Sequence, residues 1–217
     1  AGLEATRVCA SRGHEVILME AADQSGGQIN LAARVLRRKE ILGITDWLFD
    51  QVERLGVTIR LGCYAEALTV EAEHPDIVII ATGGVPNLEF LGEEQALATS
   101  SWDVLAGTEK LKKNVLMYDD NAQHAGISCA EFIAEAGCSL EYVSPEMMVA
   151  PDIGGTNHPA YLRSLYGHAA TITLNHRLLS VTREDDGLAA TLYNEYTGLQ
   201  MSRRVDQVVV DHGSLPA

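Results

Sequence analysis

A small set of residues has the types and the spacing that a bound dinucleotide needs. Gly2 opens an apolar stretch typical of a helix, and Glu20 follows it by eighteen positions, at the end of the β-branched run 14–19. A glycine at a helix N-terminus allows close packing on a strand and leaves backbone N–H groups facing a pyrophosphate. An acid about 20 residues later hydrogen-bonds a ribose hydroxyl. The alternative is an ordinary surface glycine and a solvated acid.

Two loops strengthen this interpretation. Gly26, Gly27 and Gln28 follow a polar turn soon after the acid, and adjacent glycines let the backbone approach a ligand closely. Thr82 and Gly83 follow the strongly apolar run 76–80, in an Ala-Thr-Gly-Gly sequence typical of the second glycine turn of flavoproteins with two dinucleotide-binding domains. A plain turn remains the alternative for the glycine pair. We expect the acid and both loops to line one pocket for an adenine dinucleotide.

The elements around these residues follow an α/β pattern. Helical periodicity at 2–12 and 31–55 alternates with apolar runs at 14–19, 57–61 and 76–80, which predict buried parallel strands. A second strand–helix–strand unit is predicted at 115–118, 126–136 and 140–143, then a helix at 158–166. Four runs at 171–174, 179–183, 188–193 and 205–210 predict a small antiparallel meander. The fold class is therefore α/β and Rossmann-like, three-layered around a parallel sheet.

The division into domains follows from the two strand–helix–strand units. We expect an FAD- or ADP-binding domain at 1–105, without its first strand and completed by 205–217, and an NAD(P)-binding-like domain at 106–204. The sequence begins inside a glycine motif and stops directly after a strand, which predicts a piece of a longer protein.

The turn of the second unit is unsuited to a phosphate. Residues 119–124 contain no glycine, and Asp119 and Asp120 would repel a pyrophosphate, although carboxylates suit a helix N-terminus. Ser144 and Pro145 end the next strand, where a ribose-binding acid or a phosphate-binding arginine would be expected. This part of the sequence therefore predicts the fold of a nicotinamide-dinucleotide site without the residues that would bind the dinucleotide.

Composition excludes several classes of partner. The 217 residues are 47% hydrophobic and carry a net charge of −14, which argues against nucleic acid and anionic membranes. No run is long enough to span a bilayer, and no signal peptide is visible. The four cysteines form no C-x-x-C pair, so we expect free thiols and a reducing cytoplasm. His158, His168 and His176 lack metal-ligand spacing, and we predict no metal site.

Five features together resemble one family: Gly2-Leu3-Glu4-Ala5, Gly26-Gly27-Gln28, Lys39-Glu40, Ala81-Thr82-Gly83 and the altered second turn. They are similar to the C-terminal part of the multidomain NADH:flavin oxidoreductases related to old yellow enzyme. That family includes 2,4-dienoyl-CoA reductase, the trimethylamine, dimethylamine and histamine dehydrogenases, and N-methylproline demethylase-like proteins. The resemblance covers the whole chain and is most specific in its N-terminal half.

The resemblance implies a division of labour between this chain and a preceding domain. A TIM barrel with FMN, a 4Fe–4S cluster and the catalytic residues would come first in the polypeptide, so no catalytic residue is expected here. Eight positions would hold FAD, or ADP: Gly2, Glu20, Gly26, Gly27, Gln28, Ala65, Thr82 and Gly83. The resemblance assigns Ala65 only by its place just after the predicted strand at 57–61, which is the third strand of the complete unit.

The second turn decides which branch of the family the sequence resembles. The dienoyl-CoA reductases keep its glycines and use NADPH, whereas the amine dehydrogenases have lost them and pass electrons to a partner flavoprotein. The residues from Asp119 to His124 favour the amine dehydrogenase or N-demethylase branch, with NAD(P)H doubtful. The alternatives are an NAD(P)H-dependent enoyl reductase domain and a catalytically silent ADP-binding scaffold. We expect a homo-oligomer, and expect this chain alone to be inactive and free of nucleotide.

Overall fold

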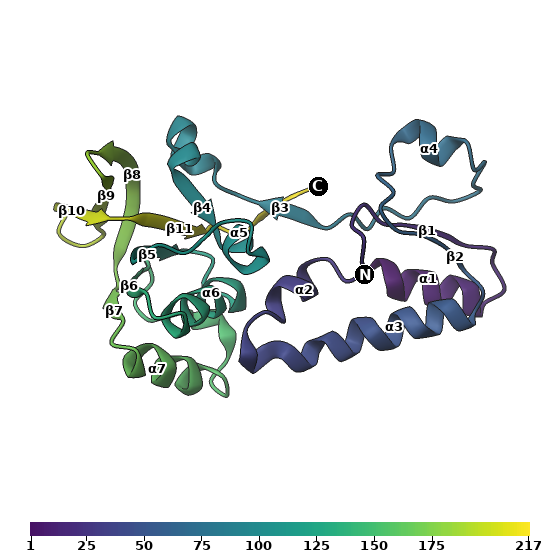
Figure 1. Cartoon of the computed structure of the whole chain (residues 1–217), viewed down its shortest axis with the longest axis horizontal. Helices are drawn as coiled ribbons and strands as arrows, with labels where there is room; N and C mark the ends of the chain where they lie inside the picture. The colour runs from purple at the N-terminus through teal and green to yellow at the C-terminus, as the bar shows by residue number, and fades with distance from the viewer. The chain divides into compact units, whose positions relative to one another are not determined.

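A computed structural model describes residues 1–217, which divide into two compact units (Figure 1). Unit 1 contains Ala1–Gly83 together with Pro216–Ala217, and unit 2 contains Gly84–Leu215. The boundary expected at residue 105 therefore lies inside unit 2. None of the helices is long and apolar enough to cross a bilayer.

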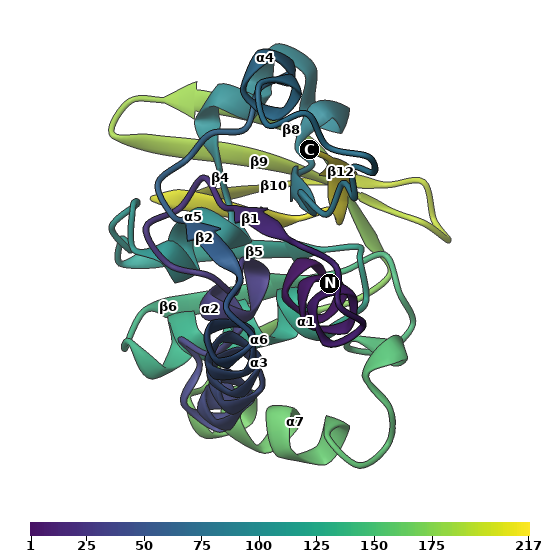
Figure 2. The same ribbon diagram turned by 90° about the vertical axis from the view of Figure 1, so that its right-hand side faces the viewer.

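Unit 1 has few strands and many helical segments. Its elements are α1 (Gly2–Ser11), β1 (Ile17–Met19), α2 (Gln28–Ala32), η1 (Leu36–Ile41), α3 (Leu42–Arg54), β2 (Thr58–Arg60) and α4 (Ala67–Glu71). The strands β1 and β2 pair in parallel, with Leu18 opposite Ile59, and α1 packs against α3 (Figure 2). Its fully buried side chains are few, among them Val35 and Val52. The helical periodicity predicted at 31–55 is present, but it is divided among three segments.

The prediction of a buried strand at 76–80 is wrong. These residues belong to neither helix nor strand, and the side chains of Ile77, Val78, Ile79 and Ile80 are exposed. A strand needs a neighbour that accepts and donates backbone hydrogen bonds. The sheet of unit 1 contains only β1 and β2, so the run has no strand to pair with.

Unit 2 is built on a five-stranded parallel sheet in the order β4-β11-β5-β6-β7. These strands are β4 (Ala98–Ser100), β5 (Asn114–Asp119), β6 (Ser139–Val143), β7 (Thr171–Thr173) and β11 (Gln207–Asp211). The helical elements are η2 (Glu89–Leu97), α5 (Ser101–Ala106), α6 (His124–Glu135), η3 (Pro151–Ile153) and α7 (His158–Gly167). A separate two-stranded ribbon joins β3 (Gly84–Pro86) to β12 (Ser214–Pro216).

The two faces of this sheet are covered differently. Leu116, Tyr118, Val208 and Val210 point to one face and form a core with the antiparallel strands β8 (His176–Glu184), β9 (Gly187–Asn194) and β10 (Gln200–Val205). The helix α6 packs on β5, β6 and β11 and also contacts α5 and α7 (Figure 1). Because both faces are covered, the strands read as continuous apolar runs.

The predicted meander is only partly correct. The runs at 171–174 and 205–210 contain β7 and β11, which are strands of the parallel sheet, and the true meander is β8-β9-β10. The strand β10 was not predicted, because only Met201 and Val205 of its six residues are apolar. The predicted strands at 115–118 and 140–143 and the helices at 126–136 and 158–166 are confirmed.

Candidate dinucleotide site

Glu20 ends β1 and is held beside the loop that follows β2. Its N–H donates to the Arg60 carbonyl at 3.0 Å, and its own carbonyl accepts the N–H of Cys63 at 2.9 Å. Its Oε1 accepts the N–H of Ala22 at 2.9 Å, which fixes the carboxylate at the strand end. The exposed Ala65 lies two residues beyond Cys63 in the same loop. The structure therefore brings these two predicted site residues to neighbouring loops.

The N-terminus of α1 lies against the end of the 76–82 segment. A Cβ on Gly2 would be 3.4 Å from the Cβ of Ala81, an ordinary contact distance. Ala1 caps the helix without any side-chain hydrogen bond. The N–H groups of the first turn consequently have no side-chain acceptor, which is the arrangement that suits a phosphate.

The glycines of the two loops share a backbone conformation but differ in the space around them. Gly26, Gly27 and Gly83 have φ values of +119°, +54° and +78°, which a residue with a side chain adopts only with strain. A Cβ on Gly26 would lie 2.7 Å from Oδ1 of Asn30, so the end of that side chain would have to move to make room for it. A Cβ on Gly27 would meet nothing within 4 Å, and one on Gly83 would meet only Nε2 of Gln28, at 3.9 Å. Gly27 therefore leaves open space at the loop.

All eight predicted site residues lie in unit 1, and the structure joins them in two groups. In the first group, Gly2 lies against Ala81, and the following residues Thr82 and Gly83 approach Gln28, which follows Gly26 and Gly27 directly. In the second group, Glu20 and Ala65 lie in adjoining loops. The Thr82 hydroxyl donates to the Ala217 carbonyl at 2.8 Å, so it already has an acceptor within the chain. An uncapped helix start and open glycine loops fit the ADP half of a dinucleotide. Their role in binding stays a prediction.

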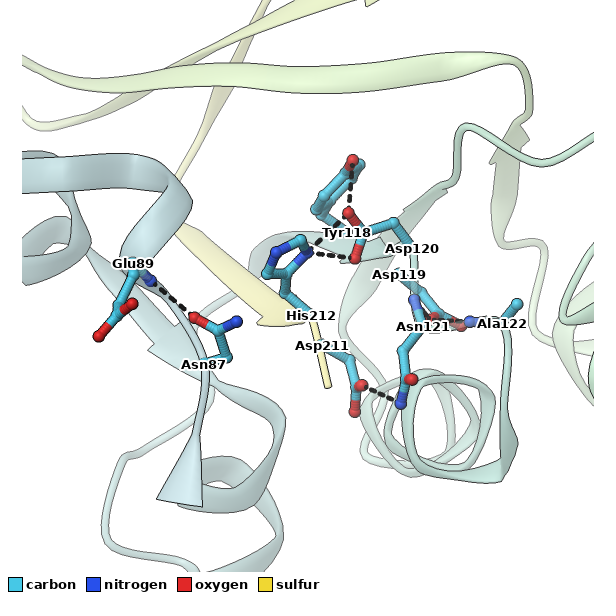
Figure 3. Close-up of polar contacts among 9 residues, drawn as sticks. All are labelled: Asn87, Glu89, Tyr118, Asp119, Asp120, Asn121, Ala122, Asp211 and His212. Carbon is cyan, nitrogen blue, oxygen red and sulfur yellow. Dashed lines mark hydrogen bonds and ion pairs between the residues drawn. The ribbon is translucent and has the colours of Figure 1, made fainter. Parts of the chain in front are cut away.

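The corresponding turn of unit 2 is filled by its own side chain (Figure 3). Asp119 ends β5 and is fully buried; its Oδ1 accepts the N–H groups of Asn121 and Ala122, each at 3.1 Å. The Tyr142 hydroxyl donates to its Oδ2 at 2.7 Å. A Cβ on Gly126, in the first turn of α6, would overlap this carboxylate. The Asp119 carboxylate thus fills the space next to Gly126 at the start of α6.

A second carboxylate shares this buried region. Asp211 ends β11 directly opposite Asp119 in the sheet register, and it accepts hydrogen bonds from Ser101 at 2.7 Å and from the Asn121 amide at 2.9 Å. Burial raises the pKa of Asp119 to about 7, with the charge of Asp211 adding to the effect and the Tyr142 hydrogen bond opposing it. The pKa of Asp211 is also raised, mainly by burial.

The remaining carboxylate of the turn is paired. Asp120 lies 2.7 Å from Nδ1 of His212 and accepts a hydrogen bond from Tyr118 at 3.2 Å (Figure 3). The ring of Phe90 lies 4.6 Å from the ring of His212. Sequence reasoning found the two aspartates but missed Tyr142, Asp211 and His212. The one available signal was Asp211-His212-Gly213, which follows an apolar strand at the point where a second glycine turn would be expected.

Two curated relatives match this chain along its whole length, although no family model matches it. A probable N-methylproline demethylase of Rhizobium meliloti is 44% identical over 216 residues, which cover 100% of this chain and 32% of the relative. An N,N-dimethylglycine/sarcosine dehydrogenase of Chromohalobacter salexigens is 46% identical and is covered to the same 32%, with 99% of this chain. The chain therefore spans about a third of the length of these relatives.

The histamine dehydrogenase of Rhizobium sp. 4-9 has a similar solved structure. Its TM-score is 0.87 at 22% identity, and the match covers 99% of this chain and 34% of that one. At this identity the likeness concerns the fold. The predicted Rossmann-like fold with a parallel sheet and a small antiparallel sheet is confirmed.

Proposed function

Because the chain belongs along its whole length to the NADH:flavin oxidoreductase family related to old yellow enzyme, we propose that unit 1 binds the ADP half of FAD, or ADP itself, within a larger oxidoreductase. The observation that carries this proposal is the position of the uncapped α1 N-terminus beside Ala81, at the start of the loop whose Gly83 approaches Gln28. Such a helix start offers unpaired N–H groups and a positive dipole end to a pyrophosphate.

Each predicted residue has a distinct part in this proposal. The α1 N-terminus at Gly2 holds the pyrophosphate, and the carboxylate of Glu20 accepts a hydrogen bond from a ribose hydroxyl. Gly26, Gly27 and Gln28, and likewise Thr82 and Gly83, would let the backbone approach the dinucleotide closely. Ala65 would contact the nucleoside. When bound, FAD supplies electron-transfer chemistry, and these residues bind and orient it.

The names of the relatives suggest the reaction of the parent enzyme. One relative is named a probable N-methylproline demethylase and another an N,N-dimethylglycine/sarcosine dehydrogenase, so we infer a methylated amine or amino acid as substrate. The reacting groups would be FMN and a 4Fe–4S cluster in a preceding TIM barrel, outside this chain. An electron-transfer flavoprotein as acceptor, a homo-oligomeric assembly and a cytoplasmic location complete the proposal.

The filled turn of unit 2 favours a structural function for that unit over binding of NAD(P)H. The Asp119 carboxylate fills the space next to Gly126, which argues against an NAD(P)H-dependent enoyl reductase domain. Unit 2 would then have a structural role in the larger oxidoreductase. If the nucleotide in unit 1 is ADP, the chain as a whole would be a silent ADP-binding scaffold.

The test is to identify the nucleotide in the enzyme purified with all its domains. We expect denaturation to release FAD or ADP in addition to FMN, with FAD supporting the redox role and ADP supporting the scaffold. Glu20→Gln should lower the content of this second nucleotide about tenfold, since a charged hydrogen bond contributes on the order of 1.5 kcal/mol. Asp23→Asn, which changes an exposed acid three residues later, is the control.

Two results would contradict the proposal. One is an enzyme that retains FMN but releases no adenine nucleotide. The other is an equal loss of nucleotide in the Glu20 and Asp23 variants. Micromolar binding of NADH or NADPH by unit 2 would separately overturn the role given to Asp119.

A further inference from the structure

A short two-stranded ribbon lies outside the two larger sheets of unit 2. It pairs β3 with β12 and has three residues on each strand. Beyond the strands, the N–H of Asn87 donates to the Gly213 carbonyl at 3.1 Å and closes one end of the ribbon. A two-stranded ribbon is marginally stable without tertiary support. Its stability therefore depends on contacts made by the residues at its ends.

The ribbon also contains both connections of the chain between the units. Gly84 and Leu215 are the first and last residues of unit 2. The two strands approach closely at this point, because a Cβ on Gly84 would be only 2.6 Å from the Leu215 carbonyl oxygen. How firmly the ribbon is held on unit 2 therefore determines how freely both connections can bend.

The side chain of His212 makes contacts on both sides of the ribbon. It lies between β11 and β12, and its Nδ1 is 2.7 Å from each carboxylate oxygen of Asp120, in the turn after β5 (Figure 3). An ionised carboxylate only accepts hydrogen bonds, so Nδ1 is the donor. The ring of Phe90, which follows β3 at the start of η2, lies 4.6 Å from the ring of His212. His212 thus connects the chain before β12 with the chain after β3.

Tyr118 closes these contacts into a ring of four side chains. Its hydroxyl donates to Oδ2 of Asp120 at 3.2 Å, and its aromatic ring lies 5.8 Å from that of Phe90. Tyr118 is fully buried on β5, which fixes this part of the cluster in the core. The side chains of His212 and Asp120 are 32% and 12% exposed, so water can replace their contact once it breaks. The cluster therefore has one fixed side and one side that can open.

We propose that His212 is a latch for the ribbon. While Nδ1 is bound to Asp120 and the imidazole lies against Phe90, β3 and β12 are held on unit 2. When both contacts are lost, the ribbon loosens and the parallel sheet stays folded. That sheet has its own support, because β11 is buried throughout and pairs with β5 over five positions. The latch controls the bending of the two connections, and it holds whether or not unit 1 binds a nucleotide.

The test is hydrogen exchange in the enzyme purified with all its domains. His212→Ala removes both contacts of the latch. We expect the amide of Asn87, whose hydrogen bond to Gly213 closes the ribbon, to exchange at least about tenfold faster, because the ribbon then opens locally. The amides of β6, which contributes no residue to the cluster, should be unchanged. His168→Ala, at an exposed histidine that binds a carbonyl of its own helix, is the matched control.

A second variant tests whether the two residues act together. Asp120→Asn keeps an oxygen that can accept from Nδ1, so it should accelerate the Asn87 amide less than His212→Ala does. Adding it to His212→Ala should change the rate by less than about twofold, since the latch is already open.

Three results would overturn the proposal. One is an unchanged Asn87 amide in the His212 variant. Another is an equal acceleration of the β6 amides, which would show that His212 only stabilises unit 2 as a whole. The third is a full additive effect in the double variant, because His212 and Asp120 would then act separately.

Discussion

The N-termini of α1 and α6 present their backbone N–H groups to different surroundings. Neither helix has a hydrogen bond from a side chain at its N-cap. At α1, the first residue Gly2 lies beside Ala81, at the start of the loop that contains Gly83. At α6 the carboxylate of Asp119 lies over Gly126 and accepts the N–H groups of the turn. The two helix starts therefore differ in their surroundings: Gly2 has only Ala81 nearby, whereas Gly126 lies against a buried carboxylate.

Burial of the Asp119 carboxylate costs free energy. Asp119 is removed from water next to a second buried carboxylate, and its pKa rises to about 7 as a result. Its hydrogen bonds to Tyr142 and to two backbone N–H groups offset part of that cost. The turn of unit 2 is thus filled by its own carboxylate, and the comparison with unit 1 can be tested by altering either helix start.

The largest expected difference in stability between the units comes from replacing the glycine at each helix start by alanine. Gly126→Ala should destabilise the protein by about 3 kcal/mol, because the new Cβ would overlap the Asp119 carboxylate. Gly2→Ala should change stability by less than about 0.5 kcal/mol, since its Cβ would meet only Ala81 at 3.4 Å. Urea unfolding measures both. Similar losses in the two variants would remove the contrast between the units.

A smaller effect should follow from neutralising Asp119. The raised pKa means that this group's contribution to stability is complete below its unfolded-state value of 3.8 and is lost as the pH rises to about 7. Asp119→Asn cannot ionise, so we expect it to be the more stable form by about 2 kcal/mol at pH 8, with the advantage vanishing near pH 4. Urea unfolding across this range is the measurement, with Asp152→Asn, an exposed acid of unit 2, as control. A pH-independent difference would contradict the assignment.

The smallest effect concerns the hydrogen bond that supports the carboxylate. Tyr142→Phe removes a donor that lowers the pKa of Asp119, so that pKa should rise further above 7. The loss of stability at pH 8 should be about 1 kcal/mol and should shrink in acid. Tyr166→Phe, at an exposed position on α7, provides the control. A shift of the Asp119 pKa to lower values would show that the hydroxyl does not donate to it.

Many helices and strands of unit 2 can be predicted from the sequence, because the apolar residues that indicate them are also the residues that are buried in the fold. The apolar strands at 115–118 and 140–143 and the helix between them form where the pattern predicts them. The run 76–80 has an equally strong pattern, yet it forms no strand, because a strand requires a partner and apolar periodicity does not supply one. The strands at 171–174 and 205–210 were predicted correctly as strands but assigned to the wrong sheet, since pairing depends on contacts far apart in the chain.

The residue types and their spacing, taken alone, determined the α/β class, the glycine loops around Glu20 and the absence of glycines between Asp119 and His124. These are local properties, written in short stretches of chain. Which side of the turn Asp119 would face, and that Tyr142 and Asp211 would surround it, depended on the register of three parallel strands. A one-residue change of register turns every side chain to the opposite face, and only long-range packing selects among the registers.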